Sequence, residues 1–322
     1  MSIKRIGVLT SGGDSPGMNA AIRAVVRSAI YHGLEVYGIK RGFAGLLSEE
    51  IEPMVSLSVG GIINRGGTIL RSARCEEFKM PEGLQRGAAI LDKYGIDALV
   101  IIGGDGSMRG GLELSQICPV KIMGLPGTID NDIPGTDFTI GFDTAVNTAL
   151  EAIDKIRDTA YSHERVFVVE VMGRHKGFIA LEVGLAGGAE AILIPEVPYD
   201  LVELLDKLRE SYEHGKRSSI IVVAEGAARA EDVKKFLQEH TPYHLRALVL
   251  GHMQRGGAPT AFDRVLATQL GVFAVQRLLD GHTNEMVGVE GGRLVAVPIE
   301  YIQIATKTLD LRKLEVAAMM AI

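Results

Sequence analysis

The chain has 322 residues, more than a single core usually holds, so we expect two lobes. Its formal net charge of -6 excludes a general nucleic-acid-binding surface, so a site for anionic ligands must be a local cluster of arginine and lysine. Cys75 and Cys118 are too few for a disulfide framework or a zinc cage, which favours a reducing cytoplasm. The apolar run before Thr10 is too short for a signal peptide, and no apolar stretch is long enough to span a membrane.

The N-terminal part predicts a strand, a glycine-rich loop, a helix and a second strand. These elements are expected at residues 5–10, 11–17, 19–31 and 35–39. A loop in that position presents backbone N–H groups and a helix N-terminus to phosphate groups. Its spacing fits neither GxGxxG nor the Walker A pattern, which excludes the usual dinucleotide and P-loop signatures.

A second glycine-rich site follows a buried strand. Residues 41–81 are expected to be irregular, and their arginines suggest either a phosphate-binding surface or a solvated loop. A helix at 85–94 and a strand at 97–102 follow, and the strand ends in Gly-Gly-Asp-Gly-Ser. Asp105 in this motif is well placed to hold Mg²⁺ between nucleotide phosphates.

The loop at residues 124–136 combines two prolines and three glycines with closely spaced carboxylates. In an extended backbone Asp130 and Asp132 point the same way, and such a pair attracts a metal ion or a hydroxyl proton. The alternative is a pair of Asx-turn residues that satisfy the backbone of the loop. An amphipathic helix is expected to start near Phe142.

Further β-α units complete the chain. Strands are expected at 166–171, 191–194, 219–224 and 246–250, and helices at about 201–214, 232–240 and 260–280. Polar motifs follow five strand ends, where open α/β sheets bind ligands. We therefore predict an α/β fold of two doubly wound sheet-and-helix lobes that face each other across an active-site cleft.

Five motifs taken in order carry a resemblance to a known family. They are Thr10-Ser-Gly-Gly-Asp14, Gly103-Gly-Asp-Gly-Ser107, Pro126-Gly-Thr-Ile-Asp-Asn-Asp132, Met172-Gly-Arg174 and Gly251-His-Met-Gln-Arg-Gly-Gly257. Together they resemble the bacterial ATP-dependent 6-phosphofructokinase family over nearly the whole chain. The resemblance implies an ATP-binding lobe of residues 1–141 plus about 254–304, and a sugar-phosphate-binding lobe of residues 142–253 plus about 305–322.

The resemblance also implies a nucleotide site in the first lobe. Asp105 would organise Mg²⁺ beside the ATP phosphates, and Cys75 has the alternative of a small packing residue. The residues implied in nucleotide binding are Gly13, Arg74, Cys75, Gly104, Asp105, Gly106 and Ser107.

The sugar site implied by the resemblance holds fructose 6-phosphate. Asp130 would take the proton from the 1-hydroxyl group, with Arg174, Thr128 and Asp132 as the other catalytic residues. Arg165 and Arg246 would reach in from a neighbouring subunit of a homotetramer, whereas His252 alone has the alternative of a structural histidine. The implied sugar-binding residues are Thr128, Asp130, Asp132, Arg165, Met172, Gly173, Arg174, Glu225, Arg246, His252 and Arg255.

Donor choice and regulation also follow from the resemblance. Glycine at 106 and 127 is similar to the ATP-dependent branch, because pyrophosphate-dependent relatives carry longer side chains there. An effector site for ADP and phosphoenolpyruvate is implied, but Gly61 and His214 replace the usual Asp and Arg, so we expect weak regulation, and Phe43 replaces a common tyrosine near the adenine. The implied effector residues are Arg23, Arg27, Arg157, Glu190, Lys216 and Ser218.

Three functional hypotheses remain at this point. The first is an ATP:fructose-6-phosphate 1-phosphotransferase, which performs the committed step of glycolysis. The second is a pyrophosphate-dependent or other-hexose phosphate kinase on the same scaffold. The third is a catalytically silent sugar-phosphate sensor, against which the intact Asp105, Asp130 and Arg174 argue.

Overall fold

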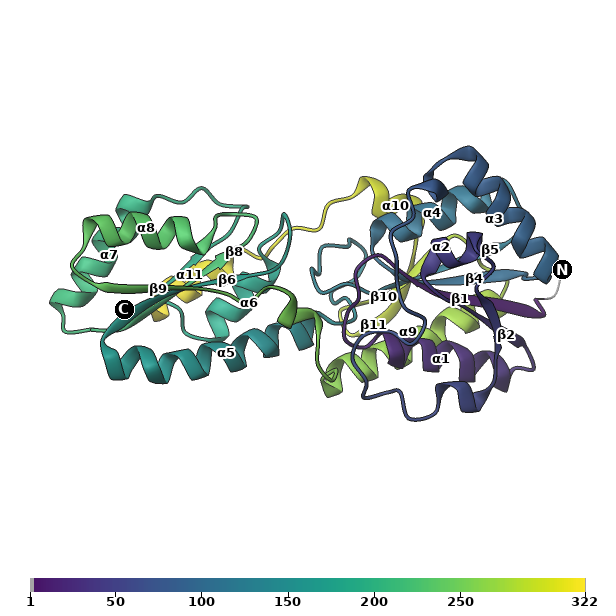
Figure 1. Cartoon of the computed structure of the whole chain (residues 1–322), viewed down its shortest axis with the longest axis horizontal. Helices are drawn as coiled ribbons and strands as arrows, with labels where there is room; N and C mark the ends of the chain where they lie inside the picture. The colour runs from purple at the N-terminus through teal and green to yellow at the C-terminus, as the bar shows by residue number, and fades with distance from the viewer. Residues whose placement is uncertain (1–2, 322) are drawn as a thin grey trace. The chain divides into compact units, whose positions relative to one another are not determined.

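The computed structural model describes residues 3–321. Its internal contacts divide the chain into two compact units, each with its own sheet (Figure 1). Unit 1 comprises Met1–Ile129, Ile133–Thr144 and Arg255–Lys307, and unit 2 comprises Asp130–Asp132, Ala145–Gln254 and Thr308–Ile322. The predicted α/β class is confirmed.

Unit 1 is built on a seven-stranded sheet in the order β11-β10-β5-β4-β1-β2-β3. Its strands are β1 (Arg5–Ser11), β2 (Glu35–Ile39), β3 (Ile51–Met54), β4 (Ala98–Gly103), β5 (Lys121–Pro126), β10 (Glu285–Glu290) and β11 (Arg293–Pro298). The five inner strands run parallel, and the edge strands β3 and β11 are antiparallel to their neighbours. Every residue of β4 is buried, as its uninterrupted apolar run predicts for a strand covered on both faces.

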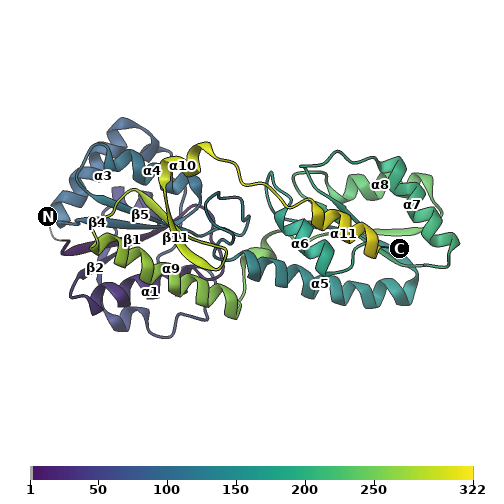
Figure 2. The ribbon, with the colours of Figure 1, turned by 180° about the vertical axis from the view of Figure 1, so that it is seen from behind.

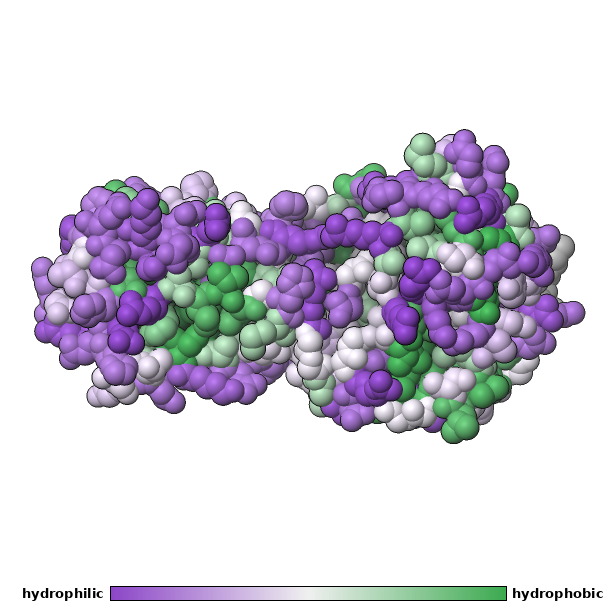
Figure 3. Space-filling view, in the orientation of Figure 1, coloured by the Kyte–Doolittle hydropathy of each residue, from purple (hydrophilic) through white to green (hydrophobic). Residues whose placement is uncertain are grey.

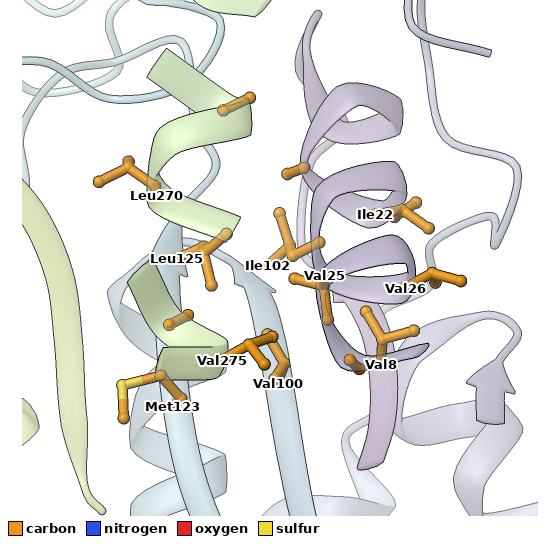
Figure 4. Packing of buried hydrophobic residues seen from close by; sticks show 14 of the residues in the cluster. Val8, Ile22, Val25, Val26, Val100, Ile102, Met123, Leu125, Leu270 and Val275 are labelled. Atoms are coloured by element: carbon orange, nitrogen blue, oxygen red, sulfur yellow. The ribbon is translucent and has the colours of Figure 1, made fainter. Parts of the chain in front are cut away.

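Helices cover both faces of this sheet. They are α1 (Met18–Tyr31), α2 (Gly42–Leu47), α3 (Pro81–Tyr94), α4 (Asp105–Ser115), α9 (Ala261–Leu279) and α10 (Ile299–Ile304), with short 3₁₀ turns η1 (Ser56–Val59) and η2 (Glu77–Lys79). Figure 4 shows α1 and α9 side by side over the strands, with Val25 and Val275 directed at the sheet. A Cβ at Gly271 would lie 2.6 Å from the Ala24 Cβ, so this glycine lets the two helices approach closely.

Three stretches of unit 1 differ from the prediction, and one of them is the helix α10, which was not predicted. The segment 41–81 is not wholly irregular, because it contains α2 and the edge strand β3. The β10–β11 hairpin was not predicted, although its turn is Gly291-Gly292, both at positive φ, which is a strong hairpin signal.

Unit 2 is a smaller parallel sheet in the order β7-β8-β6-β9. Its strands are β6 (Arg165–Val171), β7 (Ala191–Leu193), β8 (Ser219–Ala224) and β9 (His244–Val249). Its helices are α5 (Phe142–His163, whose first turn belongs to unit 1), α6 (Phe178–Ala186), α7 (Leu201–Glu213), α8 (Ala230–His240) and α11 (Arg312–Met320), and η3 (Gly251–Arg255) follows β9. Figure 2 shows α11 close to α6, and neither of these helices was predicted.

No helix among residues 3–321 is both long enough and apolar enough to cross a membrane.

Candidate active site

Three loops meet at one edge of the sheet in unit 1. They follow the neighbouring strands β5, β4 and β1, whose carboxyl ends lie together because the strands are parallel. A Cβ at Gly103 would lie 2.4 Å from the Ser11 carbonyl oxygen, and the Gly127 N–H donates to the Gly103 carbonyl at 3.0 Å. The glycines thus let three backbone segments touch, as expected for a cradle of main-chain N–H groups.

Asp105 stands at the first turn of α4 and is exposed. The neighbouring Gly104 and Gly106 have nothing within 4 Å of the position where a Cβ would lie, so there is open space on both sides of this carboxylate. Among the described residues no three acidic, histidine or cysteine side chains gather as a metal cage. One exposed carboxylate with open space around it fits a cation such as Mg²⁺ that takes its other ligands from phosphates and water.

The segment that holds Arg74 and Cys75 packs against the first loop. Thr10 Oγ1 donates to the Arg71 carbonyl at 2.7 Å, and Ser72 Oγ donates to the Gly12 carbonyl at 2.6 Å. Arg74 is exposed beside this loop, whereas Cys75 packs against the apolar core, in agreement with its packing alternative. Sequence position alone could not place this segment, because the contacts join residues about 60 positions apart.

Phe43 is buried and stacks on Phe78 with ring centroids 4.1 Å apart. Its role in the fold is therefore to fill the core of unit 1 between α2 and η2.

Asp130 and Arg174 come together in unit 2. The Asp130 carboxyl is buried, and its Oδ2 lies 3.7 Å from Nε of the half-exposed Arg174. Between the two carboxylates, Asn131 has a φ of 53°, in the left-handed region. The expectation of an extended backbone from Asp130 to Asp132 is therefore wrong, because the tight loop turns at Asn131.

Glu225 fixes the loop that follows β6. Its Oε1 accepts hydrogen bonds from the N–H groups of Gly173 at 3.1 Å and Arg174 at 2.7 Å. Arg174 itself has a φ of 55°, an unfavourable region for a long side chain that these two hydrogen bonds help to maintain. On the same loop, the Met172 N–H donates to Oε1 of the buried Gln254 at 2.8 Å. Gln254 was not among the predicted site residues, although it lies inside the Gly251–Gly257 motif.

Arg165 and Arg246 of the predicted sugar site do not join this group within unit 2. Arg165 begins β6 whereas Met172 follows its end, and seven strand residues at ~3.3 Å each separate them by roughly 20 Å. Arg246 lies opposite Phe167 on the edge strand β9, near the same amino end of the sheet. His252 is exposed on η3. Arg255 belongs to unit 1, where its guanidinium group packs against Gly13, and Thr128 lies in unit 1 as well.

The predicted effector residues form two groups in the two units. Arg23 and Arg27 lie one turn apart on α1, partly and fully exposed respectively. In unit 2 the buried Glu190 carboxylate lies 3.0 Å from Lys216 Nζ and 4.0 Å from Arg157 Nη1. These cations thus already have an anionic partner within the chain.

Glycine loops at parallel strand ends, a carboxylate at a helix start and a buried carboxylate beside an arginine are typical of α/β enzymes of phosphoryl transfer. A family model described as phosphofructokinase matches residues 5–278. The chain belongs to the phosphofructokinase family.

Curated relatives span almost the same length. The ATP-dependent 6-phosphofructokinase of Bacillus pumilus (strain SAFR-032) is 60% identical over 91% of this chain and 92% of its own. That of Paenibacillus macquariensis is 56% identical over 99% of each chain. The chain also superimposes on the phosphofructokinase of Saccharomyces cerevisiae with a TM-score of 0.87 and 38% identity, covering 99% of this chain but 48% of the yeast chain. The chain thus spans about half the length of that yeast relative.

Proposed function

We propose that the chain transfers the γ-phosphoryl group of ATP to the 1-hydroxyl group of D-fructose 6-phosphate, giving fructose 1,6-bisphosphate and ADP, the committed step of glycolysis. The observation that carries this proposal is the buried Asp130 carboxylate beside Arg174, on a loop between two parallel-strand units. The relatives at 56 to 60% identity that bear the name ATP-dependent 6-phosphofructokinase support the donor and the acceptor.

Asp130 acts as the general base in this proposal. Its carboxylate takes the proton of the sugar 1-hydroxyl, which then attacks the γ-phosphorus in line. Arg174 lies beside this carboxylate, where its positive charge would stabilise both the ionised base and the oxygens of the phosphoryl group during its transfer. Glu225 holds the Arg174 backbone, so the point from which this side chain extends is set before substrate arrives.

Nucleotide and metal would bind at the loops of unit 1. Gly13, Gly104, Gly106 and Ser107 would line the phosphates, Arg74 and Cys75 would border them, and Asp105 would be the protein ligand of Mg²⁺. When bound, Mg²⁺ would neutralise charge on the β- and γ-phosphates.

Assembly completes the sugar site in this proposal. Arg165 and Arg246 lie near the amino end of the strands, whereas their own Met172–Arg174 loop follows the carboxyl end of β6. In this proposal they therefore do not act in the site of their own subunit. The edge strand β9 exposes Leu248 and Val249, and Figure 3 shows apolar (green) surface gathered over this part of unit 2. An exposed apolar edge strand favours pairing with another subunit, which supports a homotetramer in which these arginines serve a neighbour.

Regulation and location follow the same family logic. Arg23, Arg27, Arg157, Glu190, Lys216 and Ser218 would bind ADP or phosphoenolpyruvate weakly, and the enzyme would act in the cytoplasm. Gly61 has a φ of 66° and open space where a Cβ would lie, and as a glycine it offers no side chain to an effector. This supports weak regulation.

The decisive experiment is a coupled assay of fructose 6-phosphate with ATP and, separately, with pyrophosphate. ATP-dependent turnover is expected; turnover with pyrophosphate alone would favour the pyrophosphate-dependent alternative, and none with either would favour the sensor. In the same assay Asp130→Ser should lower kcat by roughly two to four powers of ten and leave sugar-phosphate affinity within a few-fold. A kcat within threefold of the parent would remove Asp130 from the base role.

A further inference from the structure

Asp263 is a fully buried carboxylate that none of the proposed catalytic steps uses. It lies on the first turn of α9 and is 0% exposed. Its Oδ1 accepts from the Gly141 N–H at 2.8 Å, and its Oδ2 accepts from the Thr144 N–H at 2.8 Å and the Thr144 hydroxyl at 2.5 Å. All three donors belong to one short segment at the start of α5.

This carboxylate does the work of an N-cap for a helix to which it does not belong. The first N–H groups of α5 lack partners within their own helix, and Gly141, which precedes the helix at a φ of 105°, has no side chain to offer. In return, Thr260 Oγ1 donates to Asp143 Oδ2 at 2.6 Å, and the Thr260 N–H donates to Thr144 Oγ1 at 3.0 Å. The starts of α5 and α9 are thereby locked in one closed hydrogen-bond network.

The network adjoins the C-terminal end of the loop that carries Asp130. Hydrogen bonds join the two ends of this loop. The Thr139 hydroxyl donates to the Thr128 carbonyl at 2.7 Å, and the Ile140 N–H donates to the Pro126 carbonyl at 2.8 Å. The next residue is Gly141, held by Asp263. A change at the Asp263 carboxylate therefore acts on the C-terminal end of the loop.

The same network lies at two of the places where the chain passes between the units. The chain leaves unit 1 after Thr144 and re-enters it at Arg255, a few residues before Thr260. Hydrogen bonds between 143–144 and 260–263 therefore hold the first turn of α5, which belongs to unit 1, to the start of α9. A network with only a stabilising role could lie anywhere in the core, whereas this one adjoins the proposed catalytic loop and two of the points where the chain changes unit.

We infer that Asp263 is a positioning residue for the phosphoryl-transfer reaction, which acts by holding the Gly141–Thr144 segment and thereby the loop of Asp130. This inference rests on the proposed function, because it assigns Asp263 a role through the proposed base. It adds a residue far along the sequence to the set on which turnover depends.

The test compares Asp263→Asn with Asp97→Asn. Asp97 is a matched control, because its carboxylate also accepts two backbone N–H groups in unit 1, from Lys4 at 2.7 Å and Arg5 at 2.9 Å, but at the amino end of the strands. With both variants folded, Asp263→Asn should lower kcat for fructose 6-phosphate about tenfold or more while the KM for ATP stays within threefold, and Asp97→Asn should leave kcat within twofold. An unchanged kcat in folded Asp263→Asn would overturn the inference.

A double-mutant cycle separates positioning from general stability. If Asp263 acts through Asp130, adding Asp263→Asn to Asp130→Ser should lower kcat by less than threefold further. A full, independent tenfold loss in that background would contradict the positioning role.

If Asp263→Asn does not fold, Thr144→Val decides, because it removes one hydroxyl from the network. Thr144→Val is then expected to lower kcat by at least threefold, and this loss should disappear in the Asp130→Ser background. An unchanged kcat would again overturn the inference. Inactivity of the parent with ATP and fructose 6-phosphate would contradict the proposed function itself, so the two failures are distinguishable.

Discussion

The guanidinium group of Arg255 lies directly on the backbone of Gly13, so that a Cβ at Gly13 would stand 2.1 Å from Arg255 Nη1. Both residues belong to unit 1, although the sequence resemblance assigns Arg255 to the sugar phosphate and Gly13 to the nucleotide. We therefore expect Arg255 to link the occupancy of the two proposed substrate sites.

Gly13→Ala should therefore displace Arg255 and weaken binding of both substrates. Displacing the flexible end of Arg255 costs little stability, but losing one charged hydrogen bond to a substrate costs ~1.5–3 kcal/mol, which corresponds to roughly a 10- to 150-fold rise in KM. Steady-state kinetics with ATP and with fructose 6-phosphate measures it. The control is the same substitution in an Arg255→Ala background, where the clash is gone and no further rise in the KM for ATP is expected; an equal rise there would show that the methyl group disturbs the loop by itself.

Gly106 and Gly127 should respond differently to substitution, although the sequence resemblance relates both of them to the use of ATP. A Cβ at Gly106 meets open space, whereas a Cβ at Gly127 would lie 3.0 Å from Ile102 Cγ2 and 3.1 Å from Met18 Cε. A side chain at Gly127 would thus press on its neighbours in unit 1, and the expectation that this glycine favours ATP stays a prediction.

We predict that Gly106→Asp keeps the parent's stability within ~0.5 kcal/mol but severely impairs the use of ATP, because it puts a carboxylate into the space beside the phosphates. Gly127→Ala should instead lower the free energy of unfolding by ~1–3 kcal/mol. Denaturant unfolding together with kcat/KM for ATP distinguishes the two. Unchanged kcat/KM in Gly106→Asp would remove this glycine from donor selection.

The sequence predicted local structure best where a single pattern dominates. β4 and β8 are continuous apolar runs and are buried at every residue, and α9 begins one residue after its cap Thr260 and ends shortly before Gly281. The helix α6 was missed because it is apolar nearly all round and shows no helical periodicity. Asp263 could not have been found, because its role depends on contacts with residues about 120 positions away.

Asp263 should also make stability depend on pH. Burial raises its pKa from 3.8 to about 6, against the opposing effect of its hydrogen bonds with Thr144 and Gly141, and the nearby charge of Asp143 adds to the rise. Because the folded state binds this proton more tightly than the unfolded state, the stability that it contributes is fully present below about pH 4 and is lost as the pH rises through about 6.

A shift of about two pKa units corresponds to ~3 kcal/mol at most. Asp263→Asn cannot titrate, so its destabilisation relative to the parent should be largest below about pH 4 and should shrink by up to that amount by pH 8. Denaturant unfolding of both proteins at several pH values measures the difference. A destabilisation that stays constant over this range would show that the carboxyl does not titrate between these values.

The last prediction concerns assembly, and it follows from the distance between Arg246 and the Met172–Arg174 loop along the sheet. If Arg246 serves the site of a neighbouring subunit, Arg246→Ala and Asp130→Ser should each be nearly inactive alone, yet they should complement each other when mixed. In a hybrid pair, the site built on the Arg246→Ala subunit has its own Asp130 and receives Arg246 from its partner. Random reassembly after mild denaturation should then restore about a quarter of the parent's activity, because half of the pairs are hybrids and each has one intact site of two. The control is each variant denatured and reassembled alone, which should stay inactive. Absence of complementation, with hybrid assemblies verified by native mass spectrometry, would mean that each subunit builds its sugar site from its own arginines.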